Sequence, residues 1–287
     1  MPSPSFQLQY ISDIHLEFHD KQNKGAIQPD MFVKPGAADY LALVGDIGIP
    51  ELNSMPAFLA WCSQNWKEVF WVPGNHEFYN YRNTPIPVDE KEAYMRTLAS
   101  RWPNVHYLNR EAFELDASIR ILGCTLWSFI PTESEKDALL KMNDSKQIKV
   151  NNERTAVPSD FNTWHTRDRE WLVQEIQRAK LEKKELIVLT HYLPSFRLIH
   201  PKYENYPLNC CFATNLESLI QAPVRAWLCG HSHMAVDTTI HSVCCSLNPY
   251  GYPGENHPPL INRAKVLSLE TPMRPSKESK EEDYEFV

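Results

Sequence analysis

The stretch Tyr40-Leu41-Ala42-Leu43-Val44-Gly45-Asp46 indicates the fold class of this chain. Its uninterrupted apolar run predicts a β-strand buried on both faces, like the strands inside a parallel sheet. Gly45 lacks a Cβ and allows a tight turn, so Asp46 would present its carboxylate where the strand ends and a loop begins. In α/β folds, functional sites collect at such carboxyl ends of strands. The stretch therefore predicts an α/β protein with a polar site at one edge of its sheet.

Four further segments carry metal-ligand residue types directly after an apolar run. They are Asp13-Ile14-His15, Gly74-Asn75-His76-Glu77, Thr190-His191 and Gly230-His231-Ser232-His233. Side chains two residues apart in an extended segment point the same way, so Asp13 and His15 can reach one ion. The same spacing applies to His231 and His233. Each segment alone carries little weight, but the five together indicate one common site.

The predicted ligand set contains carboxylate, amide and imidazole groups. It comprises Asp13, His15, Asp46, Asn75, His191, His231 and His233, with His76 left over. Seven ligands are too many for one ion but suit two, if one carboxylate bridges them. Oxygen and nitrogen donors favour zinc, manganese or iron, and the lack of cysteine disfavours a structural zinc. Two divalent or mixed-valence ions would leave the site positive, so that it attracts phosphate and lowers the pKa of bound water.

Helix and strand patterns alternate along the rest of the chain. Besides 40–44, strands are predicted over 6–12, 69–72, 105–108, 112–115, 119–126, 186–189, 225–229, 236–247 and 263–269. Helices are predicted over 56–66, over 89–100 with Asp89 as its cap, and over 167–184. Residues 19–36 are expected to form a long loop. Residues 131–163 show no clean periodicity, which leaves room for a helix or lid near 137–149.

Length and composition favour a single domain over 1–270, followed by a polar and mobile tail over 271–287. The chain has 287 residues, of which 43% are hydrophobic, and a net charge of -7. This acidic balance argues against binding to a nucleic-acid backbone. No secretory signal is visible, and no apolar run reaches the roughly 18 residues that span a bilayer. The seven cysteines show no Cys-x-x-Cys spacing, so reduced thiols and a cytoplasmic location are expected.

The five segments resemble those of the calcineurin-like metallophosphoesterase superfamily, whose pattern runs Asp-x-His, Gly-Asp, Gly-Asn-His-Glu/Asp, His and Gly-His-x-His. The resemblance spans 13–233 and no motif is missing. It implies an α/β fold, namely a four-layer αββα sandwich of two mixed β-sheets flanked by helices. It also implies how the ligands divide: Asp13, His15 and His233 hold one ion, Asn75, His191 and His231 hold the other, and Asp46 bridges them.

The resemblance further implies a dinuclear metal-dependent hydrolase in which a hydroxide bridging the metals attacks phosphorus. His76 would be no ligand, but would face the scissile phosphate and donate a proton to the leaving oxygen. Glu77 would orient His76 or the turn backbone, or simply contact solvent.

Departures from one branch of the superfamily bear on the substrate. Serine/threonine protein phosphatases carry Gly-Asp-x-x-Asp-Arg-Gly and an arginine before Gly-Asn-His-Glu. Here the corresponding stretches are Gly45-Asp46-Ile47-Gly48-Ile49-Pro50 and Val72-Pro73-Gly74, so the phosphate-binding arginines and the aspartate that pairs with the catalytic histidine are missing. The chain looks closer to the cyclic-nucleotide-phosphodiesterase-like and general phosphoesterase branches. With few fixed cations, a singly charged phosphodiester is favoured over a monoester.

Aromatic and basic residues near the motifs are candidates for substrate contacts. They are Tyr79, Tyr192, Arg197 and His200. Their rings could stack on the leaving group, or could simply pack between loops. The alternatives to a phosphodiesterase are a phosphomonoesterase or broad-specificity phosphatase, and a non-catalytic metal-binding scaffold. The sequence leaves the metal identity, the physiological substrate and the oligomeric state open.

Overall fold

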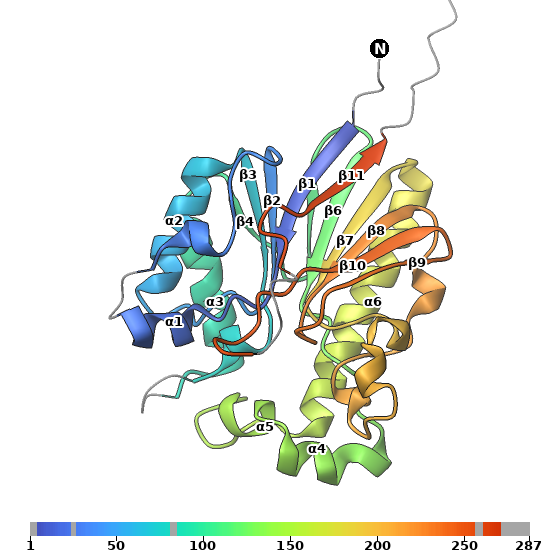
Figure 1. The fold of residues 1–287 in the computed structure, drawn as a ribbon. Coiled ribbons are helices and arrows are strands. Elements are labelled where there is room, and N and C mark those ends of the chain that lie inside the picture. The colour runs from blue at the N-terminus through green and yellow to red at the C-terminus, as the bar shows by residue number, and fades with distance from the viewer. Residues whose placement is uncertain (1–4, 24–26, 81–84, 256–260, 271–287) are drawn as a thin grey trace, which may run out of the picture.

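Two mixed β-sheets pack face to face, and helices cover their outer surfaces (Figure 1). The structure, a computed structural model, describes residues 5–23, 27–80, 85–255 and 261–270. Helices α2 (Ser54–Asn65) and α3 (Val88–Ala99) lie outside one sheet, and α6 (Pro158–Glu182) lies outside the other. The expected four-layer sandwich of two mixed sheets flanked by helices is confirmed.

The first sheet has the strand order β11-β1-β2-β3-β4. Its strands are β1 (Ser5–Ile11), β2 (Tyr40–Val44), β3 (Glu68–Val72), β4 (Val105–Tyr107) and β11 (Val266–Glu270). Strands β1 to β4 run parallel, and β11 pairs antiparallel with β1. Because parallel strands end at the same edge, the carboxyl ends of β1, β2 and β3 lie side by side.

The second sheet has the strand order β5-β6-β7-β8-β10-β9. Its strands are β5 (Glu111–Glu114), β6 (Ile119–Cys124), β7 (Glu185–Thr190), β8 (Val224–Cys229), β9 (Val236–Ile240) and β10 (Val243–Leu247). Strands β6, β7, β8 and β10 are parallel, while β5 and β9 pair antiparallel at the two edges. The carboxyl ends of β7 and β8 are therefore neighbours as well.

Shorter helices lie beside the strand ends. They are α1 (Leu16–Asn23), α4 (Glu135–Lys141) and α5 (Asp144–Gln147), with 3-10 turns η1 (Pro29–Met31), η2 (His76–Phe78), η3 (Thr132–Ser134), η4 (Phe196–Leu198), η5 (Pro201–Tyr203), η6 (Asn209–Cys211) and η7 (Glu217–Leu219). Helices α4 and α5 form the bottom of the molecule in Figure 1, beyond the strands. In the described part of the chain, no helix is long and apolar enough to cross a membrane.

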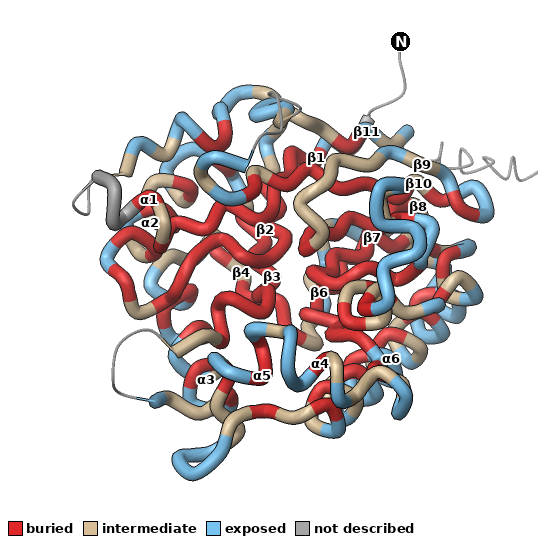
Figure 2. The backbone as a smooth tube through the Cα atoms, turned by 60° about the horizontal axis from the view of Figure 1, so that its bottom comes forward, coloured by how far each residue is buried: buried red, intermediate tan, exposed pale blue. Residues whose placement is uncertain are grey.

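Apolar side chains fill both faces of each sheet, which explains the continuous apolar runs in the sequence. Between the sheets lie Leu8 and Val72 from the first sheet and Ile121 and Leu189 from the second. In Figure 2 the central strands are almost wholly buried, and exposed backbone lies at the periphery. Burial on two faces fixes the direction of every strand residue, so the strand ends are held rigidly.

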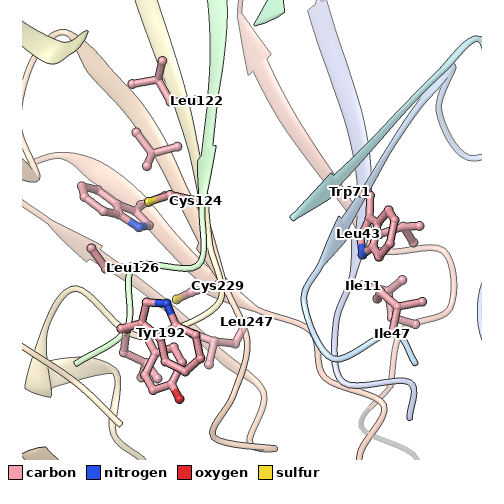
Figure 3. Close-up of a cluster of buried hydrophobic side chains, with 14 of the residues drawn as sticks. Ile11, Leu43, Ile47, Trp71, Leu122, Cys124, Leu126, Tyr192, Cys229 and Leu247 are labelled. Carbon is pink, nitrogen blue, oxygen red and sulfur yellow. The ribbon is translucent and has the colours of Figure 1, made fainter. Parts of the chain in front are cut away.

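The outer faces of the sheets pack against the helices. Figure 3 shows Leu43 and Trp71 with neighbours from the first sheet on one side, and Leu122 and Cys124 with neighbours from the second sheet on the other. All four side chains are at most 1% exposed. All seven cysteines are free thiols in the structure.

Three predicted elements are corrected by the structure. Residues 19–36 are not a continuous loop, because α1 and η1 lie within or across this range. Asp89 does not cap α3; the N-cap is Pro87 without a side-chain cap bond, and Val88 N donates to Lys149 O at 2.8 Å instead. The single strand predicted over 236–247 is a hairpin of β9 and β10, because the chain turns at His241 and Ser242.

The poorly periodic segment 131–163 contains α4 and α5, and α6 begins nine residues before the predicted start at residue 167. Pro158 occupies the first turn of α6, where its missing N–H is harmless, and the side chain of Asp160 accepts a hydrogen bond from Val157 N at 2.9 Å. The predicted tail over 271–287 lies outside the described residues.

Candidate metal centre

The candidate ligands lie at the carboxyl ends of parallel strands from both sheets. Asp13, Asp46 and Asn75 follow β1, β2 and β3, and His191 and His231 follow β7 and β8. Hydrogen bonds join the sheets at this edge, and two of them involve candidate ligands bonded to the opposite sheet. His231 N donates to Asp13 Oδ1 at 3.0 Å, and His191 Nδ1 donates to Val44 O at 3.1 Å. The fold thus brings together side chains that are more than 200 positions apart in the sequence.

Five candidate ligands have left-handed backbone conformations. The φ angles are 54° at Asp13, 51° at His15, 53° at Asp46, 69° at His231 and 52° at His233. Such conformations are uncommon for residues other than glycine, and each costs about 1–3 kcal/mol. Strain of this kind persists where the surrounding structure enforces it, and it gathers at functional sites. The strained residues gather at the candidate ligands, which indicates that the fold holds these side chains in place at the expense of local backbone stability.

One group of ligand atoms comes from Asp13, His15 and His233. Their donor atoms lie within 4.8 Å of one another. The Nε2 atoms of His15 and His233 face each other at 3.0 Å, and His233 Nε2 lies 3.5 Å from Asp13 Oδ1. Three donors that converge from the ends of β1 and β8 can hold a cation between them.

A second group comes from Asp46, His191 and His231, again within 4.8 Å. His191 Nε2 lies 3.4 Å from Asp46 Oδ2 and 3.1 Å from Asn75 Oδ1. Asn75 therefore adds an amide oxygen to the three donors of this group. The ring of His231 lies 5.0 Å from that of His191.

Asp46 lies between the two groups. Its Oδ2 atom is 3.8 Å from His15 Nε2 of the first group and 3.4 Å from His191 Nε2 of the second. Its Oδ1 atom accepts a hydrogen bond from His76 N at 2.8 Å, which fixes the carboxylate. One carboxylate oxygen of Asp46 therefore lies near ligand nitrogens of both groups, which is the geometry a bridging ligand needs.

The candidate ligand imidazoles differ in their pKa shifts. Burial lowers the pKa of His191, but the charge of Asp46 raises it to about 9; burial also lowers the pKa of His233, but its hydrogen bond to Glu255 raises it. Burial lowers the pKa of His15, and burial with the charge of His191 holds the pKa of His231 well below its usual value. Both rings are therefore neutral at pH 7, the form that binds metals. Burial raises the pKa of Asp46, but the charges of His191 and His76 hold it well below the ordinary value.

The Nε2 atom of His231 provides a direct test of fit. It is buried and has no hydrogen-bond partner among the described residues. A buried polar atom without a partner is costly, by about 1–3 kcal/mol. A cation held with Asp46 and His191 would satisfy it, so the residues present fit a metal ion.

Glu77 fixes the turns that carry the ligands. It is fully buried, and its Oε2 atom accepts hydrogen bonds from Asp46 N at 2.9 Å and Gly74 N at 2.8 Å. Its Oε1 atom accepts a third, from Ile47 N at 2.8 Å. Of the roles considered for Glu77, the structure supports the one in which it orients the turn backbone.

Two glycines are required by close approaches in the same turns. A Cβ at Gly74 would lie 2.1 Å from Asp46 Oδ1, and a Cβ at Gly45 would lie 2.3 Å from His191 Nδ1. Gly45 also has a φ of 80°, which other residues rarely adopt. The ligand side chains pack directly against the backbone of these glycines, so larger residues at either position would displace them.

His76 is held by a carboxylate that the sequence analysis missed. Glu17 Oε1 accepts hydrogen bonds from His76 Nδ1 at 3.0 Å and from His15 Nδ1 at 3.1 Å. Burial lowers the pKa of His76, but the charges of Asp46 and Glu17 raise it to about 9. The other ring atom, His76 Nε2, lies 3.2 Å from the hydroxyl of Tyr252. Glu17 lies in the first turn of α1, two residues after His15, and belongs to none of the five motifs, so no sequence signal points to this role.

Two further carboxylates contact candidate ligands. Glu255 Oε2 accepts a hydrogen bond from His233 Nδ1 at 2.9 Å, and Asp144 Oδ1 accepts one from Asn75 Nδ2 at 2.8 Å. Partners of this kind orient metal ligands and are costly to remove. Neither was predicted, because both lie in segments without a recognisable motif.

A cleft of about 520 Å³ opens beside the site. Its lining includes Asp46, Asn75, His76, His231 and His233 together with Tyr79, His200, Tyr203, Tyr206 and Tyr252. Two of the proposed substrate contacts, Tyr79 and His200, therefore reach it. The ring of Tyr79 stacks on that of His76 at 4.2 Å.

The other two proposed substrate contacts lie elsewhere. Tyr192 is 2% exposed and packs beneath the site, with its ring 4.1 Å from that of His231. Arg197 Nη1 lies 3.8 Å from Glu217 Oε2. Neither residue is part of the cleft lining, so the cleft gives their predicted contacts with substrate no support.

Comparisons with known proteins gave matches in sequence and in structure. A sequence model of the calcineurin-like phosphoesterase family matches residues 10–235. An uncharacterised protein of Acanthamoeba polyphaga mimivirus is 32% identical over 263 residues, covering 87% of this chain and 92% of that protein. The crystal structure of phosphopantetheinyl hydrolase from Mycobacterium tuberculosis superposes with a TM-score of 0.61 at 18% identity, covering 88% of this chain and 90% of that chain. At this identity the structural likeness shows a shared fold alone.

Proposed function

Because the chain belongs to the calcineurin-like phosphoesterase family, we propose that it hydrolyses small phosphodiesters with two divalent metal ions at the candidate metal centre. Family membership supports a metal-dependent phosphoester hydrolase. The number of ions and the preference for diesters are the further steps proposed here. The observation that carries the proposal is the position of the Asp46 carboxylate, 3.8 Å from His15 Nε2 and 3.4 Å from His191 Nε2.

The ligand groups divide between the two ions as the geometry suggests. Asp13, His15 and His233 would hold one ion, Asn75, His191 and His231 would hold the other, and Asp46 would contact both. This donor set suits zinc, manganese or iron. When bound, the ions supply Lewis acidity that neutralises phosphate oxygens and lowers the pKa of water.

His76 is the proposed acid. Glu17 accepts from His76 Nδ1, so the ring presents Nε2 toward the cleft, beside the Tyr252 hydroxyl. The Glu17 carboxylate at Nδ1 favours the protonated ring, which would carry its second proton on Nε2. His76 would move this proton to the leaving oxygen as the phosphorus–oxygen bond breaks. Tyr79, which stacks on the opposite side, limits the motion of the ring.

The charge of the cleft supports a diester. Lys141 is the only lysine or arginine among the described residues of its lining, and its ammonium lies 2.6 Å from Asp137. A phosphomonoester or a nucleoside polyphosphate would bring more negative charge than this wall can match. A diester carries one charge, which the metal centre would neutralise alone.

Exposed tyrosines in the cleft lining support an aromatic leaving group. Tyr203 and Tyr206 are 39% and 45% exposed, and both line the cleft with His200. Exposed tyrosine rings offer stacking surface and a hydroxyl for hydrogen bonding. We therefore assign His200 and Tyr79 to substrate contact, and an uncharged planar group such as a nucleoside or aryl alcohol to this part of the lining.

Two assays test the proposal. With manganese present, bis-para-nitrophenyl phosphate is expected to be cleaved faster than para-nitrophenyl phosphate; the reverse order would indicate a phosphomonoesterase. The His76→Ala variant is expected to lose about 100-fold or more in kcat while keeping its metal. A variant with near-normal turnover would remove His76 from the mechanism, and a wild-type protein without turnover on either substrate would favour a metal-binding scaffold.

A further inference from the structure

Asp144 is a buried carboxylate surrounded by hydrogen-bond donors next to the metal centre. It begins α5, and it is 5% exposed. Its Oδ1 atom accepts hydrogen bonds from Asn75 Nδ2 at 2.8 Å and from the Tyr79 hydroxyl at 2.5 Å. Its Oδ2 atom accepts one from the Tyr192 hydroxyl at 3.2 Å. All three donors point at the Asp144 carboxylate, so the network fixes its position.

The Asn75 side chain depends on such a partner for its direction. A side-chain amide has one acceptor oxygen and one donor nitrogen of nearly the same shape, and only the oxygen can bind a cation. Asn75 Oδ1 lies 3.1 Å from His191 Nε2, on the side of the second ligand group, while Nδ2 faces Asp144. A rotation of the amide by half a turn would aim N–H donors at the cation and set its oxygen against the Asp144 carboxylate.

We propose that Asp144 is a positioning residue that holds Asn75 with its oxygen directed at the second metal ion. The inference rests on the proposed function, because it takes Asn75 as a ligand. Within the described part of the chain, the Asp144 carboxylate forms no hydrogen bond with any other candidate ligand, so it acts through the amide. Partners of metal ligands typically change metal affinity by about 10–100-fold when removed.

The proposal also gives a role to the segment between β6 and α6. This segment is fastened to the loop after β3, since Asn80 N donates to Gln147 O at 3.1 Å and Tyr79 forms a β-bridge with Ile148. Lys141 and Asn143 from the same segment line the cleft. Asp144 therefore ties one wall of the substrate cleft to a metal ligand.

Manganese titration by calorimetry, on metal-stripped protein without substrate, tests the proposal. The Asp144→Ala variant is expected to keep one ion at wild-type affinity and to bind the second about 10–100-fold more weakly. Asp168→Ala is the matched control, because Asp168 is equally buried but bonds to Arg110 and to Leu126 N. This control is expected to lose stability yet bind both ions normally. If both variants lost the same manganese affinity, the loss would reflect general destabilisation, and the proposal would be overturned.

Exchanging the amide of Asn75 with the carboxylate of Asp144 distinguishes a positioning role from a packing role. In Asn75→Asp, two carboxylates would face each other at the 2.8 Å contact, and the second ion is expected to bind at least tenfold more weakly. The double variant Asn75→Asp, Asp144→Asn restores a donor opposite an acceptor, and is expected to regain an affinity within tenfold of the wild type. Failure of the exchange to restore binding, in a double variant with a native far-ultraviolet circular dichroism spectrum, would overturn the proposal.

The titration distinguishes this inference from the proposed activity. A wild-type protein that binds two ions but hydrolyses no phosphoester would refute the hydrolase and leave the role of Asp144 standing. A wild-type protein that binds fewer than two ions would refute the dinuclear site, and the role of Asp144 with it.

Discussion

Replacing Glu77 with glutamine tests whether one buried carboxylate holds the ligand-bearing turns together. In the native protein, Oε2 accepts from Asp46 N and Gly74 N, and Oε1 accepts from Ile47 N. The Glu77→Gln side chain has nearly the same shape but only one acceptor oxygen. If the amide oxygen takes the place of Oε2, the amide nitrogen meets the N–H of Ile47, and two donors face each other.

The expected loss of stability follows from the number of hydrogen bonds that change. Burial raises the pKa of Glu77 to about 7, so each of its hydrogen bonds contributes about 0.5–1.5 kcal/mol, and an unsatisfied buried donor costs about 1–3 kcal/mol. One bond is lost outright, and Ile47 N is left without an acceptor. Glu77→Gln is therefore expected to lower the free energy of unfolding by about 2–4 kcal/mol and to weaken metal binding.

Urea unfolding of metal-free protein, followed by tryptophan fluorescence, measures the loss without contributions from bound ions. Glu90→Gln, on the exposed surface of α3, is the control and is expected to stay within about 0.5 kcal/mol of the wild type. A change below about 1 kcal/mol in Glu77→Gln, with metal affinity intact, would refute the idea that Glu77 organises the turns.

Three further predictions follow from single contacts. A methyl group in Gly74→Ala would lie 2.1 Å from Asp46 Oδ1, so manganese affinity measured by calorimetry is expected to fall at least tenfold. Tyr252→Phe removes the hydroxyl 3.2 Å from His76 Nε2, and kcat is expected to fall by about 5–10-fold with both ions retained, as one hydrogen bond of about 1–1.5 kcal/mol allows. Burial lowers the pKa of His165, so the unfolded chain binds a proton below pH 6.5 that the folded chain resists, and the free energy of unfolding falls as the pH drops from 7 to 5. His165→Gln is expected to show a shallower fall in urea unfolding, and an identical pH dependence would contradict this.

The sequence was sufficient to predict the parts of the site that local pattern determines. An apolar run followed by Gly45-Asp46 marks a buried strand and its end without any tertiary information. The same holds for β7 before His191 and β8 before His231. Because both sheets are parallel at their centres, correct strand ends were enough to imply that the ligands converge.

The partners of these ligands could not be predicted in the same way. Asp144 is the first residue of α5, and α5 and the preceding α4 are only 4 and 7 residues long, too short to show a helical period. The hairpin turn between β9 and β10 has positive φ angles at His241 and Ser242, without the glycine or asparagine that usually signals such a turn. In both cases tertiary contacts determine a conformation that the local sequence only weakly prefers.

X-ray diffraction from manganese-loaded crystals, collected at the manganese absorption edge, tests the central claim most directly. Two anomalous peaks per chain are expected, one on each side of the Asp46 carboxylate. A single peak, or peaks that do not share Asp46, would contradict the bridging geometry and the dinuclear hydrolase built on it.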